Sequence, residues 1–528
     1  MFSIIFEKIK ELVKKLTGTG KSIEQVLHIK PTISSEMIEA IELWGDMYQD
    51  KAPWLKEGTL ANPERVTSLG IPAFIASEKA RMCTLEMKSK VSAIMEKVQE
   101  AQEETGLLVE QEQPIGDTTR ADFLDEQYQK TIMKDIRTQL EFGIAKGGLV
   151  IKPYVVMNVD DQGEQLAQIV MDYIQADGFY PIAFDASGRI TEAAFVQKIV
   201  NKDFTYSRLE YHKLKGTTVT IVNKAFRSHN TGAGQVSSNN GTELGTEIKL
   251  ADVPDWATME PEVTITNVDR LLFAYFKMPI ANTIDTYSPL GVSAYSRATN
   301  LIKDADEQYS RILWEFEGSE LAIDIDRDAL TLDRDKDGND ITIHSKKQNR
   351  LYRKVDMNEE STYEVFSPTI RDASLFNGLN NILMRIEDVC ELARGTIADV
   401  NAEARTATEI TVLKQRSYAA NSQLQRLLEN TLKDVVYIMD VYTTLYELAP
   451  DGDYDVSFEW DDSIQVDKES EMNKRLALVN AGISNKVEFR MWYFGETEEQ
   501  AIQALAKGQS YNNFEAQNSF ENQNNEEE

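Results

Sequence analysis

The chain has 528 residues, of which 42% are hydrophobic and 27% are charged, so it can form several domains or one subunit with several parts. It contains no apolar run of the roughly 18 residues that span a bilayer, and no signal-peptide pattern at its start, which argues against stable membrane association. Its net charge of −31 argues against tight, sequence-independent DNA binding, because such binding depends on Lys and Arg that neutralise phosphates.

Residues that commonly carry catalysis are sparse and scattered. Cys83 and Cys390 lie far apart, each in a helical pattern, which indicates buried thiols in a reducing compartment and excludes a disulfide framework. No nucleophile or zinc motif occurs, and the histidines have no metal-ligand spacing: His28, His212, His229 and His344. The sequence therefore predicts no enzyme activity and no cofactor.

At the amino end, residues 1–16 have an amphipathic, Lys-rich pattern that predicts a helix docked on the protein itself or on a partner. The following TGTGKS, Thr17–Ser22, is similar to the end of a phosphate-binding loop. That loop requires a glycine where this chain has Lys15, and a buried strand where this chain has the amphipathic helix. We therefore predict a flexible linker here.

Two helices are predicted next, over residues 34–48 and 72–103, the second rich in Met, Ala, Glu and Lys. From Gly147 the apolar period changes to two, which predicts strands at 147–159, 167–174, 192–200, 205–214 and 217–226. The residues from Ser228 to Thr246 are rich in Asn, Ser, Gly and Thr and predict a surface loop.

A segment with Pro and Gly, which begins at Tyr275, leads into a long helix predicted over 290–317. One stripe of this helix recurs at spacings of three and four and contains Ala294, Ala298, Leu301, Ala305, Tyr309, Ile312 and Phe316. The alanines in the stripe would let a neighbouring helix approach closely.

The residues from 318 to 368 have strand-like patterns. Asp333, Asp335, Asp337 and Gly338 match the first half of a calcium loop, but His344 stands where a bidentate Glu is required. Because alternating apolar residues flank Asp337-Gly338, we favour a β-hairpin. A basic cluster follows, which is either a solvated face or a docking surface for an acidic partner: Lys346, Lys347, Arg350, Arg353 and Lys354.

Helical spacing returns at 370–393 and again in a very long helix at 407–448, joined by the polar segment Arg394–Arg405. The segment DYDVSFEWDDSI follows and predicts a strand. A helical region is predicted after it, over 467–507. Residues 508–528 lack Lys and Arg and are dominated by Asn, Gln and Glu, so we expect disorder there.

Several phrases in this order resemble the portal proteins of tailed bacteriophages, of the siphovirus type. They are Trp44–Trp54 (W-x-x-M-Y-x-x-x-x-P-W), IPAFIASEKARMCTLEM, GGLVIKPYV, DGFYPIAFD, LEYH, SPLGVS before a helix with a D-x-x-D/E run, and AGISNKVEFRMWYFG. The resemblance covers roughly 44–506. Its specificity lies in the order of helix, small hairpin insert, helix, polar loop and very long helix.

The resemblance implies an α+β fold in an elongated subunit with a helical stem and crown, a mixed α/β wing and a small β-rich clip. The implied parts are N-terminal helices 1–57, wing 58–289, stem helix 290–317, clip 318–368, second stem helix 369–394, tunnel loop 395–406, long helix and return strand 407–465, crown 466–507 and a tail 508–528.

In function, the resemblance implies a ring of about twelve copies at one capsid vertex in the virion, assembled in the bacterial cytoplasm. Double-stranded DNA would pass through it, bound weakly. Its partners would be the terminase large subunit, scaffolding and major capsid proteins, and then the head-completion adaptor.

The resemblance also assigns residues. The tunnel loop would present Arg394, Thr396, Asp399, Asn401, Glu403 and Arg405 to DNA. Ala294, Ala298, Leu301, Ala305 and Tyr309 would pack the stem helices of the ring. The basic cluster Lys346, Lys347, Arg350, Arg353 and Lys354 would dock partners on the clip.

Two other classes of function remain open from the residues alone. TGTGKS and the Asp333 loop leave a nucleotide- or metal-dependent component of packaging machinery, which binding of ATP or calcium would reveal. The basic amphipathic helix at 1–16 leaves a peripheral membrane scaffold, which liposome flotation would reveal.

Overall fold

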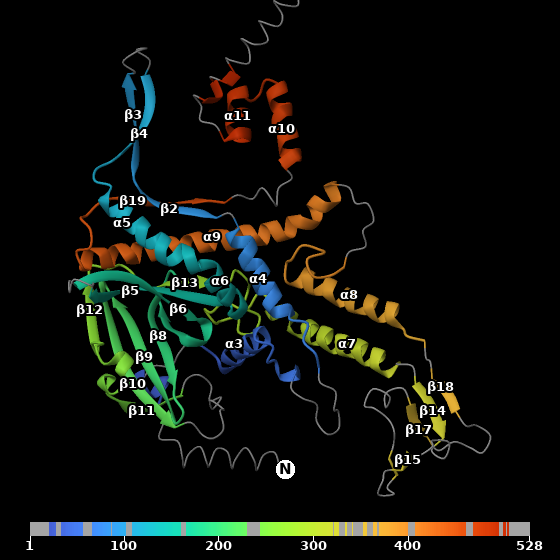
Figure 1. Ribbon diagram of the computed structural model, residues 1–528. Helices are drawn as coiled ribbons and strands as arrows, with labels where there is room; N and C mark the ends of the chain where they lie inside the picture. The colour runs from blue at the N-terminus through green and yellow to red at the C-terminus, as the bar shows by residue number, and fades with distance from the viewer. Residues whose placement is uncertain are drawn as a thin grey trace, which may run out of the picture. The chain divides into compact units, whose positions relative to one another are not determined.

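The computed structural model of the chain has mixed α and β structure with a curled sheet (Figure 1). The chain divides into two compact units, Met1–Glu403 with Ala419–Glu459, and Ala404–Tyr418 with Trp460–Glu528, and each is described by itself. The structure describes residues 21–27, 33–55, 66–85, 87–101, 108–159, 165–229, 243–319, 322–326, 333–334, 340–341, 352–355, 363–366, 369–399, 407–460, 468–495, 500–502 and 504–505.

The main sheet of the larger unit is antiparallel. Within the described residues it has the strand order β1-β11-β10-β9-β8-β7, and β12 also pairs with β10. Its strands are β1 Lys21–Ser22, β7 Phe179–Phe184, β8 Ile190–Val200, β9 Phe204–Lys215, β10 Thr218–His229, β11 Glu243–Ile248 and β12 Glu262–Thr266. The strands predicted from the period of two at 192–200, 205–214 and 217–226 are therefore confirmed.

A second sheet has the order β13-β5-β6, with β5 Gly148–Val159, β6 Gln165–Gln175 and β13 Ala274–Lys277. The chain that follows β13 crosses the start of β5 at very close range. A Cβ atom at Gly291 would lie 2.0 Å from the Gly147 carbonyl oxygen, and Gly147 itself has φ +90°. Only glycine fits both positions. The segments Gly147-Gly148 and Pro289-Leu290-Gly291 therefore cross each other at this point.

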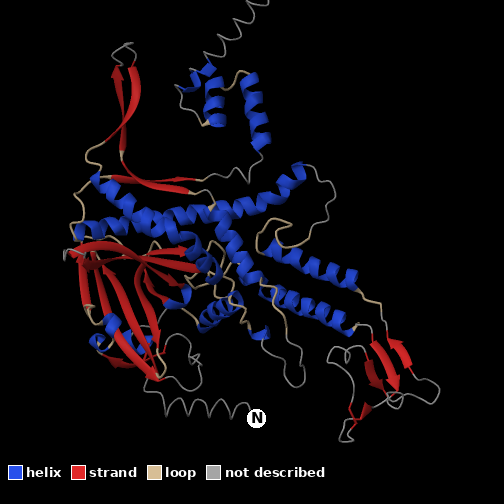
Figure 2. Cartoon of the chain, in the orientation of Figure 1, coloured by secondary structure: helices blue, strands red, loops and turns tan. Residues whose placement is uncertain are grey.

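Helices cover these sheets (Figures 1 and 2). They are α2 Ile23–Leu27, α3 Ser35–Tyr48, α4 Ile71–Thr84, α5 Thr119–Tyr128 and α6 Lys134–Lys146, with a π-helical turn at Gln129–Met133. Short 3-10 turns lie at Pro53–Leu55, Ala176–Gly178, Leu250–Asp252, Pro254–Trp256 and Ser296–Ala298. α6 packs against α3, α4 and β5. The buried Tyr295 hydroxyl donates to the Trp44 carbonyl at 2.8 Å, which ties the segment before α7 to α3.

The prediction of one long helix over 72–103 is wrong in its second half. α4 ends at Thr84, and the chain continues as β2 Lys88–Ala93 and β3 Met95–Ala101. β2 pairs antiparallel with β19, Tyr454–Glu459, and β3 pairs with β4, Leu108–Pro114. Ser89, Val91 and Ala93 are buried while Lys88 and Lys90 are not, a period of two. Pairing with a distant strand overrides the helix propensity of these residues.

The remaining elements of the larger unit begin with α7, Thr299–Gly318, and α8, Asp372–Val389, which lie side by side (Figure 1). Between them the described strands are β14 Ala322–Asp326, β15 Asp333–Arg334, β16 Asp340–Ile341, β17 Tyr352–Val355 and β18 Tyr363–Phe366. β15 and β16 pair antiparallel, as the predicted hairpin requires, and residues 335–339 between them lie outside the described residues.

The very long helix is confirmed as α9, Ala407–Leu445. Its apolar stripe, the residues that recur at helical spacing, is buried from Leu424 to Tyr442. Arg120 of α5 is also buried, and its guanidinium donates to the Asp440 carboxylate at 2.6 Å and to the Ala449 carbonyl at 2.8 Å. Burial of the stripe and this ion pair together hold the carboxyl part of α9 against the larger unit.

The smaller unit contains α10, Lys468–Asn480, and α11, Lys486–Phe494, which confirms the helical prediction for this region. The predicted helix at 1–16 and the predicted disordered tail at 508–528 lie outside the described residues. Lys21 and Ser22, predicted as linker, form β1 instead, and the fully buried Ile23 fixes the chain immediately after it.

Candidate functional site

The first part of the candidate site is the pair α7 and α8 with its inserted strands. Near the end of α7, the Glu315 carboxylate accepts two hydrogen bonds from the Arg371 guanidinium, at 3.0 and 2.8 Å. The rings of Phe316 and Phe376 lie 6.2 Å apart across the same pair. These contacts join the two helices at the point where the inserted strands leave and return.

The predicted alanine stripe faces the interior of the same chain. Ala298 and Ala305 have no exposed surface, and Ala294 is also buried. Ala294 precedes the helix, where its N–H donates to the Ile144 carbonyl, because α7 begins only at Thr299. Leu301 and Tyr309 are half-buried. The expectation of one continuous stripe from Ala294 needs correction, and the alanines bring together elements of one subunit.

One buried side chain of α7 is polar, and it bonds residues from the amino-terminal part of the chain. Asp306 is nearly fully buried and accepts hydrogen bonds from the Trp54 indole N–H at 3.0 Å and from the Leu69 backbone N–H at 2.9 Å. Burial raises the pKa of the Asp306 carboxyl, against the lowering effect of these two donors. The Trp54 that ends the first aromatic phrase of the sequence thus contacts the same helix as Ala305.

Sequence reasoning missed the exposed apolar residues of this helix pair. Trp314 is 54% exposed, and the other exposed members are Leu313, Phe316 and Phe376; Ile370, just before α8, is exposed as well. Phe316 was expected in the inward stripe, and its 40% exposure corrects that expectation. The available signal was the pair Leu313-Trp314, two large apolar residues adjacent to the stripe but outside its spacing.

The second part of the site is the segment that leaves α8 toward α9, predicted as a tunnel loop. Its first residues are held by Glu387, whose carboxylate is completely buried. The carboxylate accepts hydrogen bonds from the backbone N–H groups of Gly395, Ile397 and Ala398, the shortest at 2.6 Å. A buried charge that satisfies several backbone donors fixes this part of the backbone in one conformation.

The predicted loop residues lie close to this anchor where they are described. Arg394 pairs with Asp388, with its Nε 3.0 Å from a carboxylate oxygen. The Thr396 hydroxyl donates to the Ala393 carbonyl. Asp399 has an exposed side chain, while its backbone N–H and carbonyl both bond the Asn380 side chain at 2.8 Å. Asn401, Glu403 and Arg405 lie outside the described residues.

The predicted basic cluster is described only at its end. Arg353 and Lys354 belong to β17, which runs parallel to β14 with Arg353 opposite Asp324 and Lys354 opposite Ile325. The other three residues of the cluster, Lys346, Lys347 and Arg350, lie outside the described residues. The docking role of the cluster therefore stays a prediction.

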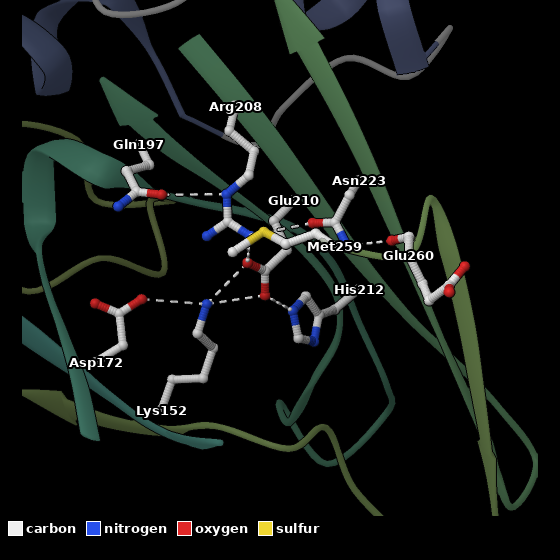
Figure 3. A network of polar contacts seen from close by, with 9 residues as sticks. All are labelled: Lys152, Asp172, Gln197, Arg208, Glu210, His212, Asn223, Met259 and Glu260. Atoms are coloured by element: carbon white, nitrogen blue, oxygen red, sulfur yellow. Dashed lines mark hydrogen bonds and ion pairs between the residues drawn. The ribbon is translucent and has the colours of Figure 1, made fainter. Parts of the chain in front are cut away.

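A buried charge network that sequence reasoning also missed connects the two sheets (Figure 3). At its centre, the Glu210 carboxylate of β9 lies 2.9 Å from the Lys152 ammonium of β5 and 3.1 Å from the Arg208 guanidinium. The His212 Nε2 lies 2.6 Å from the same carboxylate, and Asp172 of β6 lies 3.3 Å from Lys152. Residues 208, 210 and 212 alternate along β9 and therefore lie on one face of the strand. This spacing is the only sign of the network in the sequence.

In the network, the carboxylates of Glu210 and Asp172 pair with the cations of Lys152 and Arg208. Burial raises the pKa of Glu210, but the ammonium of Lys152 and the hydrogen bond from His212 outweigh it and leave the pKa well below its ordinary value. Burial lowers the pKa of His212, and within the described part of the chain the histidine Nδ1 has no hydrogen-bond partner. An adjacent cavity of about 510 Å³ is lined by Lys152, Arg208, Glu210 and Gln197. The neutral histidine donates to the carboxylate, and the network joins β5 and β6 to the main sheet.

The described residues bring together no group of three or more His, Cys, Asp or Glu side chains that could hold a metal ion. Both cysteines are buried, as predicted, and burial raises the pKa of each thiol to about 12. Among the helices of the described ranges, none is both long enough and apolar enough to cross a membrane.

Comparison with known protein families finds no matching family model, and comparison with curated proteins finds no match either.

Proposed function

We propose that this chain is a portal subunit of a tailed bacteriophage. About twelve copies would form a ring at one capsid vertex and enclose the path of double-stranded DNA during packaging and ejection. The ring would nucleate procapsid assembly with scaffolding and major capsid proteins, seat the terminase large subunit, and later bind the head-completion adaptor. The chain itself would carry out no covalent chemistry.

The observation that carries this proposal is the anchored segment after α8. The buried Glu387 and the side chain of Asn380 hold its backbone through Asp399, whose own carboxylate is exposed. A loop with a fixed base and an acidic exposed residue suits repeated weak contact with a moving phosphate backbone. Like charges repel, so such a loop would not bind the duplex tightly.

The exposed apolar residues of α7 and α8 support assembly. Leu313, Trp314, Phe316 and Phe376 would lie on the surface of an isolated subunit. Contiguous apolar residues of this kind mark contact sites between proteins. In a ring, each copy would cover these residues of its neighbour, a heterologous contact that closes on itself. The alanines, buried within one chain, would instead fix the shape of each subunit.

Electron microscopy of the purified protein tests the proposal directly. Negatively stained particles should be rings with a central hole. The hole should be wide enough for a B-form DNA duplex, about 20 Å or more. Particles that stay monomeric at every concentration tested, or that form closed dimers with no hole, would contradict the proposed function.

A further inference from the structure

The cavity of about 510 Å³ beside the Glu210 network lies where two strands each have an open edge. β7 begins at Phe179, opposite Phe195, so among the described strands β8 pairs from Val196 onward with β9 alone. In the same part of the chain, β6 pairs with β5 alone. The cavity is lined from both strands, by residues 172–175 of β6 and 195–198 of β8. A volume of this size is typical of sites that bind small molecules.

One wall of the cavity, formed by β8 and β9, offers hydrogen-bond donors. Arg208 is buried, and its Nε and Nη1 contact Gln197 and Glu210. None of the hydrogen bonds that Arg208 makes to the described residues uses its Nη2, and Gln197 likewise donates none of its amide hydrogens to them. In Figure 3 both nitrogens point to the side on which Asp172 lies. A buried guanidinium with a nitrogen to spare is a strong donor for a carboxylate.

The other wall, formed by β6, the turn after it and α3, carries carboxylates. Asp172 lies 3.3 Å from the Lys152 ammonium through one oxygen, and its second oxygen has no hydrogen bond among the described residues. Asp177 and Glu42 line the same cavity. These two lie close to Tyr180, because both add to the effect of burial in raising the pKa of its hydroxyl. This wall therefore attracts a positively charged group.

The charges and the remaining lining restrict the kind of ligand. The described lining residues include three cations and four carboxylates, and the Asp177 carboxylate also pairs with Lys146 at 2.7 Å. Because these charges balance, a ligand with a net charge of either sign would enter without full compensation. The lining also contains apolar and aromatic side chains, which suit a short hydrocarbon chain: Tyr173, Ile174, Tyr180, Phe195 and Val196.

From these observations we infer that the cavity binds a small zwitterion of the ω-amino acid class, with a carboxylate and an ammonium group at the two ends of a short methylene chain. The carboxylate accepts hydrogen bonds from Arg208 and Gln197, and the ammonium group lies beside Asp172 and Glu42. The site is complete in one copy of the chain, since all these residues belong to the larger unit. The inference is therefore independent of the proposed ring.

Ligand-observed NMR with the full-length protein tests the site. In saturation-transfer titrations, 6-aminohexanoate should give a saturable signal with a Kd on the order of 1 mM or tighter, as expected for a ligand of so few atoms. Hexanoate and hexylamine each carry only one of the two charges and should bind at least about tenfold more weakly. Glycine should be equally weak, because its charges are adjacent whereas the donors and the carboxylates of the cavity lie on different walls.

Variants assign the signal to this cavity. Arg208→Lys keeps a positive charge beside Glu210 but removes the spare nitrogen, and it should weaken binding of 6-aminohexanoate by about tenfold or more. Since Arg208 is buried, Glu42→Gln at an exposed position provides a second variant that leaves the interior unchanged, and it should weaken binding several-fold. The matched control is Glu39→Gln, an exposed residue of the same helix outside the lining, which should bind like the wild type.

The outcomes decide the inference without bearing on the ring, which electron microscopy tests separately. Hexanoate or hexylamine that binds as tightly as 6-aminohexanoate would show that only one wall recognises a ligand, and would overturn the zwitterion site. A signal that does not saturate up to about 20 mM would overturn it as well, since affinity that weak is non-specific. So would wild-type affinity in both Glu42→Gln and a folded Arg208→Lys.

Discussion

Glu387 illustrates how a single buried side chain can define a functional segment. A carboxylate with no exposed surface is stable only when donors surround it, and here the donors are backbone N–H groups of the loop base. In the sequence, Glu387 is one of many acidic residues on a predicted helix. The residues alone predict the loop as a polar joint, and only the resemblance to portal proteins predicts a tunnel loop. Its partners follow it by eight to eleven residues, a distance that helical periodicity does not reveal.

We predict that Glu387→Gln loosens the loop base. The amide nitrogen of Gln would face N–H donors, so at least one hydrogen bond would be lost at a cost of about 1–3 kcal/mol. Limited trypsin digestion should cut faster at Arg394, which precedes the anchored residues. The control Glu429→Gln removes a surface ion pair with Lys433 and should digest like the wild type. Equal rates for both variants would show that Glu387 does not hold the loop.

The charge network around Glu210 makes a prediction about pH. Because burial lowers the pKa of His212, the unfolded chain takes up a proton near its ordinary pKa of 6.5 that the folded chain does not bind. Folded stability should therefore fall as the pH drops through this range, by up to about 1.4 kcal/mol per pH unit. Lys152, Arg208 and Asp172 also face the site. The lowered pKa of Glu210 adds a further loss only below about pH 4.5.

Thermal midpoints at pH 7.5 and 5.5 test this assignment. His212→Gln keeps a donor toward Glu210 but cannot titrate, so its midpoint should drop less between the two pH values than that of the wild type. His229→Gln, which changes an exposed histidine on β10, should behave like the wild type. A wild-type midpoint that does not change between these pH values would rule out His212 as a stability-determining group.

At the scale of elements, local patterns were reliable where an element is long enough to repeat its apolar period several times. The strands from β8 to β10 and the helix α9 follow their apolar periods closely. The prediction failed for β2, whose partner β19 lies more than 360 residues away, because nothing local records that pairing. It also failed for the direction of the alanine stripe, since periodicity identifies a buried face but not which chain buries it.

A buried residue just before α7 and an exposed residue on α7 lead to opposite expectations for two substitutions. Ala298→Trp should overfill the interior of the subunit, at a cost of about 1–3 kcal/mol or more, and should reduce the yield of folded protein. Trp314→Ser should leave the thermal midpoint of the dissociated subunit unchanged and weaken ring assembly, because Trp314 is exposed in the single chain. Sedimentation separates the two effects. Normal rings from Ala298→Trp would mean that the packing around it is looser than the structure indicates.

At the scale of the whole molecule, the net charge of −31 limits how the proposed channel could treat DNA. Tight binding to phosphates requires several Lys or Arg contacts, and each contact adds to the force needed to move the duplex. An acidic surface instead repels DNA from its wall and leaves few strong binding positions. The exposed Asp399 at the end of the anchored segment fits this arrangement.

The double variant Asp399→Lys, Glu403→Lys tests whether the loop faces DNA. Position 403 lies outside the described residues, while Asp399 follows the base held by Glu387 and Asn380. Each new ammonium would attract phosphates, and with several copies in one ring the attraction would be repeated around the duplex. We expect rings to assemble normally but packaging in vitro to slow or stop, and the effect to weaken as salt is raised. As a control, Lys202→Glu and Asp203→Lys exchange two charges on an exposed turn of the main sheet without a change in net charge. A double-lysine ring that packages a full-length genome at the wild-type rate would show that this loop does not meet the DNA.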